Sequence, residues 1–146
     1  MSWDVSKVFD QFDKSIATKL DAVKMWAHPD LPNGIGLIEL SFESGQVFIS
    51  IEDEFDTLNC SRARSESQAS YTLSISSPFW DPVVGKFLIG AWKMTSDRGY
   101  PDGIQLRFRD STNAGPGTII QLYGEASQIT LTDLKEVRRA SMSKTT

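Results

Sequence analysis

Two stretches of the chain, sixty-nine residues apart, have nearly the same sequence. Residues 20–39 read LDAVKMWAHPDLPNGIGLIE, and residues 89–108 read IGAWKMTSDRGYPDGIQLRF. Seven of the twenty positions are identical without a gap, whereas average composition gives about one identity by chance. The identities are Ala22/Ala91, Lys24/Lys93, Met25/Met94, Pro32/Pro101, Gly34/Gly103, Ile35/Ile104 and Leu37/Leu106. We interpret the similarity as a duplicated β-hairpin.

The turns of the two predicted hairpins share one sequence pattern. Pro32-Asn33-Gly34 in the first copy corresponds to Pro101-Asp102-Gly103 in the second. Proline presets φ at the first turn position, and glycine supplies a left-handed residue at the end. Both sequences therefore predict a type I turn followed by a glycine bulge, in a three-residue hairpin connection.

Each copy continues with further alternating segments. Val47–Ile51 follows the first hairpin and 118–123 follows the second. Each copy then ends similarly, with Glu52, Thr57 and Leu58 corresponding to Glu125, Thr130 and Leu131, so the offset grows to 73 after a longer loop. Each copy is thus predicted to be a four-stranded meander, repeat one over 19–62 and repeat two over 86–134. A lone meander leaves one apolar face uncovered, so we expect the two to pack as a sandwich or a partly open barrel.

The N-terminal region has a different periodicity. Its apolar residues recur at helical spacing and predict an amphipathic helix over residues 3–15. The predicted class is therefore α+β, mainly antiparallel β with an N-terminal helix. Asp133 and Glu136 have capping-box spacing and could start a short helix through Arg139, although the sequence leaves both helix and strand open over 132–140. A frayed tail is predicted over 140–146. The helical stripe consists of Val5, Val8, Phe9, Phe12 and Ile16.

Composition limits the classes of function. The 146 residues suit a single domain, and no apolar run reaches the roughly 18 residues that a membrane-spanning helix needs. The N-terminus does not resemble a secretory signal, so the expected location is cytoplasmic. Residues 1–60 hold eleven Asp/Glu against four Lys, a balance of −7, and residues 61–146 hold eleven Lys/Arg against eight Asp/Glu, a balance of +3. This split favours an acidic face for a basic partner and disfavours nucleic acid, unless the two solvated faces differ by accident.

The densest acidic cluster comes at the end of a predicted strand. It places four carboxylates in five residues, from Glu52 through Asp53 and Glu54 to Asp56. One interpretation is a docking patch that attracts a basic protein. The alternatives are a divalent-metal site of hard oxygens, a hydrolase carboxylate pair, or a solvated loop that blunts a strand edge.

Few other residues suggest chemistry. The only histidine, His28, is expected in a solvated turn, and nothing near the only cysteine, Cys60, indicates an activated thiolate. No phosphate-binding glycine motif, cofactor site or cysteine-based metal site is predicted. Trp26 and Trp80 are expected near turns, where they could serve as aromatic anchors for a partner. Trp92, inside a strand, is expected in the core.

Three segments together carry a family resemblance, 42–58 (FESGQVFISIEDEFDTL), 81–92 (DPVVGKFLIGAW) and 99–108 (GYPDGIQLRF). They resemble an uncharacterised bacterial family of small single-domain proteins, and proteins of this size and make are often immunity proteins. The resemblance implies an immunity-like protein. The −7 balance of residues 1–60 and the scarcity of catalytic groups add the expectation that it is not an enzyme and presents Glu52–Asp56 to a basic toxin, with Trp26 or Trp80 as aromatic anchors. The alternatives are a carboxylate-based metal binder or small hydrolase, and a homo-oligomer, for example a homodimer.

Overall fold

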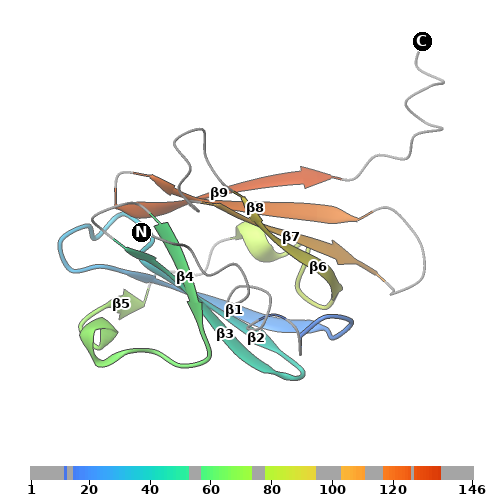
Figure 1. Cartoon of the computed structure of the whole chain (residues 1–146), viewed down its shortest axis with the longest axis horizontal. Coiled ribbons are helices and arrows are strands. Elements are labelled where there is room, and N and C mark those ends of the chain that lie inside the picture. The colour runs from blue at the N-terminus through green and yellow to red at the C-terminus, as the bar shows by residue number, and fades with distance from the viewer. Residues whose placement is uncertain are drawn as a thin grey trace, which may run out of the picture.

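The structure is a computed structural model, and it describes residues 12, 15–52, 57–73, 78–94, 103–110, 117–125 and 127–135. These residues form two antiparallel β-sheets stacked face to face. Figure 1 shows the sheet of orange and red strands lying above the sheet of blue and green ones. The side chains of residues 52, 57, 134 and 135 are outside the description.

Each sheet contains one four-stranded meander. The first sheet has the order β4-β3-β2-β1-β5 and the second the order β6-β7-β8-β9. The strands are β1 (Leu20–Ala27), β2 (Leu37–Phe42), β3 (Gly45–Glu52), β4 (Thr57–Ser61), β5 (Thr72–Leu73), β6 (Phe87–Met94), β7 (Gly103–Arg109), β8 (Thr118–Glu125) and β9 (Gln128–Lys135).

The predicted α+β class is wrong. The described helical elements are only two 3-10 turns, η1 (Glu66–Gln68) and η2 (Pro78–Trp80), and no amphipathic N-terminal helix is among them. Most of the predicted 3–15 helix lies outside the described residues. At its end, the carbonyl of Phe12 accepts hydrogen bonds from the backbone N–H groups of Ser15 and Ile16. The two sheets cover each other's apolar faces, so neither sheet needs a helix to complete the core.

The C-terminal prediction also changes. The short helix predicted from Asp133 is wrong at its start, because β9 continues as a strand through Lys135. Thr118 pairs with Lys135 and Ile120 with Asp133, so this stretch belongs to the sheet ladder. The remainder of the predicted helix and the predicted tail over 140–146 lie outside the described residues.

The core lies between the two sheets and is built from alternate strand residues. The central strands β2 and β7 contribute three fully or almost fully buried side chains each. β4 faces β7 and β8 across the core, and β3 faces β9. The six side chains are Ile38, Leu40, Phe42, Ile104, Leu106 and Phe108.

One corner of the molecule joins the two sheets. Ahead of β6, Gly85 donates its N–H to the carbonyl of Leu20 at 2.7 Å, and Ala17 donates to Leu88 at 2.7 Å. Lys19 and Phe87 form an isolated bridge between these hydrogen bonds. The two meanders are therefore hydrogen-bonded to each other at the starts of β1 and β6.

This corner reveals an internal two-fold relation, because its hydrogen bonds repeat with a constant offset of 68 residues. Phe12 accepts from Ser15 and Ile16, and Trp80 accepts from Val83 and Val84. Ala17 and Gly85 share a positive φ, 66° and 87° respectively. The equivalence begins at residue 12 in the first repeat and residue 80 in the second. These positions precede the predicted starts of the repeats, residues 19 and 86, by seven and six residues.

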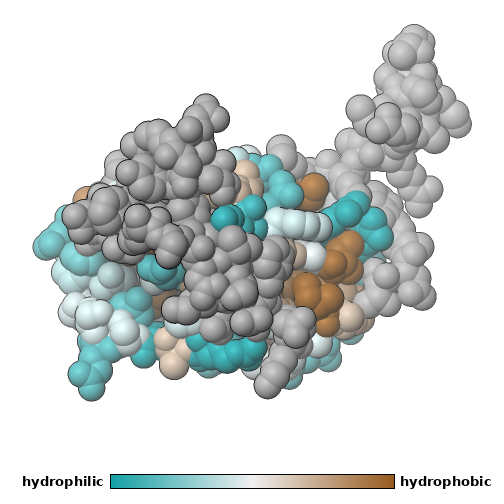
Figure 2. Space-filling model, viewed as in Figure 1, coloured by the Kyte–Doolittle hydropathy of each residue, from teal (hydrophilic) through white to brown (hydrophobic). Residues whose placement is uncertain are grey.

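Two equivalent side chains at this corner are exposed. Ile16 is 38% and Val84 is 40% exposed. Figure 2 shows an apolar area at the right-hand end of the molecule, where Figure 1 places the turn before β6.

Strand register shows which residues of the two repeats correspond. Leu20 pairs with Phe42 beside a bulge, and Leu88 pairs with Phe108 beside an equivalent bulge. The offset is therefore 68 in the first strand and 66 in the second, not the uniform 69 of the sequence alignment. The β2–β3 and β7–β8 registers extend the correspondence to offsets of 73 for β3 and 71 for β4.

The first predicted turn is present, but its glycine has another role. Gly34 donates its N–H to the carbonyl of Leu31 at 3.0 Å, so Pro32 and Asn33 occupy the central positions. The connection runs over nine residues, 28–36, and is not a three-residue hairpin. Gly34 is not left-handed, since only Gly45 and Gly85 have positive φ among the described glycines. A side chain at Gly34 would instead collide with Gln128.

The second predicted turn can be assessed only at its end. Pro101 and Asp102 lie outside the described residues. Gly103 is the first residue of β7 and pairs with Met94, so it is part of the ladder.

Candidate functional site

The predicted acidic cluster begins at the end of β3. Glu52 pairs through its backbone with Thr57. Its side chain lies outside the described residues, as do Asp53, Glu54 and Asp56. The docking, metal and hydrolase interpretations of this cluster therefore stay predictions.

The two tryptophans predicted as anchors have different environments. Trp80 is 3% exposed and belongs to the core, where its Nε1 donates to the sulfur of Met25 at 3.4 Å. It has no exposed face for a partner. Trp26 is half-buried on the outer face of the first sheet, and the guanidinium of Arg64 lies 4.1 Å from its ring centroid.

Residues Arg62–Tyr71, which we call the cover segment, pack against the end of this outer face. Arg64 stacks on Trp26. Its guanidinium also donates a hydrogen bond, 2.5 Å long, to the carbonyl of Gln68, which is the last residue of η1. Tyr71 meets the His28 ring edge-on, with centroids 5.1 Å apart. β5 follows and pairs with β1, Leu73 opposite Trp26. The chain thus covers part of its own first sheet.

The outer faces of the two sheets differ in burial. On the first sheet, Leu37, Glu39 and Phe48 point away from the core by strand alternation, yet they are 0%, 7% and 6% exposed. On the second sheet, the equivalents of Glu39 and Phe48 are Gln105 and Gln121, and both are partly exposed. The second face is therefore the more open of the two.

Trp92 lies on this second outer face, contrary to its predicted core position. It is 40% exposed. A bulge between Leu88 and Gly90 changes the phase of β6, so that Leu88 and Ala91 face the core and Trp92 faces outward. One extra residue in a strand reverses the face of every residue after it.

The indole of Trp92 lies flat on its own strand. A Cβ atom at Gly90 would stand within 2.9 Å of the ring atoms Cζ2 and Cζ3, so only glycine leaves room for the ring. Gly90 pairs with Arg107, and Trp92 pairs with Gln105. The ring therefore has one side on the sheet and polar side chains of β7 beside it.

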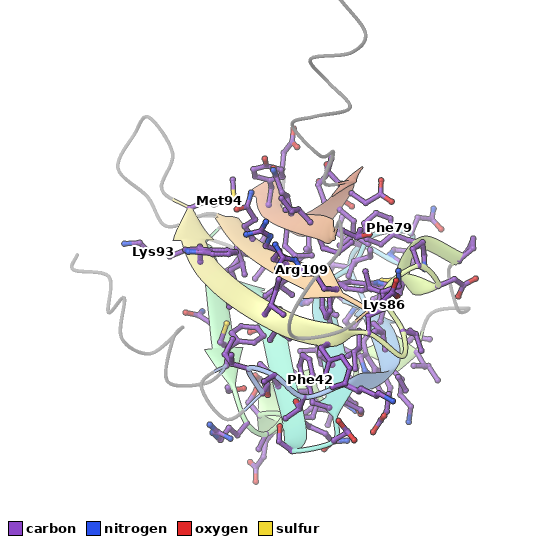
Figure 3. The ribbon with its side chains drawn as sticks, turned by 90° about the vertical axis from the view of Figure 1, so that its right-hand side faces the viewer. Phe42, Phe79, Lys86, Lys93, Met94 and Arg109 are labelled. Carbon is purple, nitrogen blue, oxygen red and sulfur yellow. The ribbon has the colours of Figure 1, made fainter. Side chains whose placement is uncertain are left out.

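The same surface continues across β8. Gln105 pairs with Gln121, and the hydroxyl of Tyr123 donates to Oε1 of Gln121. Figure 3 shows Met94 at one end of β6 and Arg109 on the neighbouring strand β7. We call this surface the Trp92 face, made of Trp92, Gln105, Arg107, Gln121 and Tyr123.

A family model with the description "Family of unknown function (DUF6334)" matches residues 1–138. The chain belongs to this family. No curated protein and no solved structure matches it. The family assignment supports the predicted resemblance to a family of small proteins, whereas the immunity interpretation stays a prediction.

The described part of this DUF6334 chain offers little catalytic chemistry. Burial raises the pKa of the Cys60 thiol to about 12, which keeps the sulfur protonated and poorly nucleophilic at neutral pH. Nδ1 of His28 accepts the backbone N–H of Asp30 at 3.0 Å. Across the described ranges, no three His, Cys, Asp or Glu side chains gather closely enough to hold a metal ion. Nor does any described helix have the length and apolarity to cross a membrane.

Sequence reasoning did not find the Trp92 face. Its central tryptophan was assigned to the core, and its glutamines, arginine and tyrosine formed no recognisable motif. The one available signal was Gly90 two residues before Trp92, because a strand glycine often marks a bulge or close packing by a neighbour.

Proposed function

We propose that this DUF6334 chain is a protein-binding domain without catalytic activity, and that the Trp92 face is its binding surface. One observation carries the proposal. Of two equivalent sheet faces, the chain covers part of one with its own Arg62–Tyr71, whereas the other carries a tryptophan that is 40% exposed. Exposed tryptophans with a flat, fixed ring are frequent hot spots of protein interfaces.

The chemistry of the Trp92 face supports binding over bond cleavage. An indole, two amides, a phenol and a guanidinium can stack and form hydrogen bonds. The face has no described carboxylate, thiol or imidazole that could act as nucleophile or general base. Its side chains stand on three adjacent strands of one sheet, so their spacing is set before a partner binds.

The narrower prediction is an immunity protein that presents Glu52, Asp53, Glu54 and Asp56 to a basic toxin. It uses a different surface from the Trp92 face, and it remains open because those side chains are not described. The metal-binding and hydrolase alternatives use the same carboxylates and remain predictions for the same reason. The homo-oligomer alternative also remains a prediction.

Site-specific photocrosslinking tests the proposal. A photoreactive phenylalanine analogue at Thr130, which pairs with Tyr123 at the margin of the face, reports on partners in the native cell. The matched control places the analogue at Ser61, an exposed position on the first sheet. We expect a discrete crosslinked protein from position 130 that is absent from position 61.

The crosslinked protein is then purified and its affinity measured by calorimetry. Trp92→Ala should weaken binding by about thirtyfold, corresponding to the roughly 2 kcal/mol of a tryptophan hot spot. Trp92→Phe should retain part of the affinity. Equal affinities for the original chain and Trp92→Ala would exclude the Trp92 face as the binding surface.

A further inference from the structure

The first sheet is covered by the residues that follow the last strand of its meander. β4 lies on one side of this sheet, and the cover segment leads from it to β5, which pairs with β1 on the opposite side. On the way, Arg64 places its guanidinium over the Trp26 ring. The first repeat therefore shows how a segment that follows the fourth strand covers an outer tryptophan.

The same position in the second repeat belongs to residues 136–146, which we call the trailing segment. The offset of 71 between β4 and β9 makes Ser61 equivalent to Thr132. β4 ends at Ser61, whereas β9 continues three residues beyond Thr132 and ends at Lys135. The trailing segment thus follows the fourth strand of its meander as the cover segment does.

The two segments share a short sequence pattern. Residues 62–67 read RARSES, and residues 138–143 read RRASMS. Three of the six positions are identical, the first arginine and both serines, and each stretch contains two arginines and one alanine. The offset is 76, five more than between β4 and β9, and the longer β9 accounts for three of those five residues.

Two differences between the repeats point in the same direction. Trp92 is two residues nearer the start of its strand than Trp26 is, because Trp26 corresponds to Met94. β9 extends towards the same end of the sheet, since Lys135 lies in the ladder row of Leu88. The outer tryptophan and the origin of the segment are therefore displaced together.

The Trp92 ring lies within reach of the trailing segment. The ring lies over Gly90, whose ladder row crosses the sheet and ends at Leu134. Three strand spacings separate the two ends of this row, roughly 14 Å. Residues 136–139 span roughly 13–14 Å when extended, and the long side chain of Arg139 adds to this reach.

We infer that the trailing segment packs across the outer face of the second sheet, with Arg138 or Arg139 stacked on Trp92 as Arg64 is stacked on Trp26. A guanidinium over an indole is a favourable pair, and exclusion of water strengthens it. A partner that binds the Trp92 face then has to displace the segment, so the segment regulates partner binding. The docking depends on the register of the repeats, whereas the regulation rests on the proposed function.

Paramagnetic relaxation in the full chain, labelled with 15N, tests the docking. A nitroxide is attached at Ser143→Cys in a Cys60→Ala background, which has no other thiol. Indole N–H intensities are compared before and after reduction of the nitroxide, and we expect Trp92 to lose more intensity than Trp26. The matched control carries the nitroxide at Ser67→Cys, the counterpart of Ser143 in the cover segment, where Trp26 should lose more.

Variants of the two arginines distinguish stacking from charge. Arg138→Gln combined with Arg139→Gln should restore most of the lost Trp92 intensity. Changing both arginines to lysine keeps the charge without the planar group, so it should restore only part. Lys144→Gln removes a cation outside the shared pattern and should leave the loss unchanged.

Three results would overturn the docking. Equal losses at Trp92 and Trp26 would favour the frayed tail predicted over 140–146. An equal Trp92 loss in a 15N chain without nitroxide, mixed with a nitroxide-labelled chain without 15N, would place the segment on a second copy. An undiminished loss in the double glutamine variant would exclude the arginine stack.

The regulation has its own test, which uses the protein captured by the crosslinking experiment. The double glutamine variant should bind that protein more tightly than the original chain, because a larger fraction of the variant has its Trp92 face free. Equal affinities would overturn the regulation. Failure of the crosslinking experiment would remove the proposed function, whereas the relaxation measurements would still decide the docking.

Discussion

Cys60 shows how its position in the sandwich sets the chemistry of a single residue. It pairs with Ile49, and its thiol packs against the core between the sheets. Loss of solvent disfavours the charged thiolate and raises the pKa from 9.0 to about 12. The folded chain therefore holds the thiol proton at pH values where the unfolded chain releases it.

This difference makes stability depend on pH above about pH 9. The unfolded chain loses the Cys60 proton first, so the free energy of unfolding should fall as pH rises towards 12. Cys60→Ala lacks this contribution. Between about pH 8 and pH 10, the original chain should lose about 1 kcal/mol more stability than the variant. Urea titrations at both pH values measure the difference, and parallel pH curves would contradict it.

The tryptophans illustrate what residue-level reasoning could and could not predict. Trp92 stands in a strand, and propensity favours the core, but a bulge at Leu88 and Gly90 decides its face. Trp80 stands in a proline-rich corner, where exposure was expected, yet its indole is buried against Met25. Both predictions were made from local sequence, whereas the outcome depends on register and on packing between sheets.

The turns before β1 and β6 have the same backbone conformation but differ in the residue that adopts the left-handed position. Both turns require a left-handed residue at the position where the sheets join, and φ is 66° at Ala17 and 87° at Gly85. Alanine in this conformation costs roughly 1–2 kcal/mol, which glycine avoids. The second repeat therefore has the less strained form of the same turn.

Exchanging the two residues tests this equivalence. Ala17→Gly should stabilise the chain by about 0.5–1 kcal/mol, because relief of strain exceeds the added entropy of the unfolded state. Gly85→Ala should destabilise it by about 1 kcal/mol through strain alone, since open space surrounds its Cβ position. Thermal and chemical unfolding of both variants give the values. Changes of equal sign in the two variants would exclude equivalent turns.

At the scale of elements, strand content was easier to predict than correspondence between repeats. Alternation correctly located strands in both copies, and the Pro32–Gly34 turn is present. The repeated turn sequences, however, favoured an ungapped alignment. The structure shortens the second hairpin by two residues between equivalent strand positions, so identical residues such as Leu37 and Leu106 are not equivalent.

For the whole molecule, the two-fold relation explains why the two described sheets need no helix to complete the core between them. Each meander buries one face against the other, and the starts of β1 and β6 are joined by backbone hydrogen bonds. The apolar N-terminal stripe predicted a helix from its period alone. Phe12 of that stripe is 1% exposed and occupies the position in the first repeat that Trp80 occupies in the second.

The offset between the repeats can be tested in solution by comparing how much equivalent core residues contribute to the free energy of unfolding. Leu20 and Leu88 are both 0% exposed and occupy equivalent positions near the starts of β1 and β6. Leu20→Ala and Leu88→Ala should therefore each cost about 3 kcal/mol, within the usual range for a buried leucine. The ungapped alignment instead pairs Leu20 with Ile89, which is only half-buried. Ile89→Ala should cost about 1 kcal/mol, as expected where little of a core contact is removed.

Urea unfolding of the three variants supplies the comparison. An Ile89 variant as damaging as the Leu20 variant, beside a mild Leu88 variant, would restore the offset of 69 and remove the register on which the comparison of the two sheet faces depends.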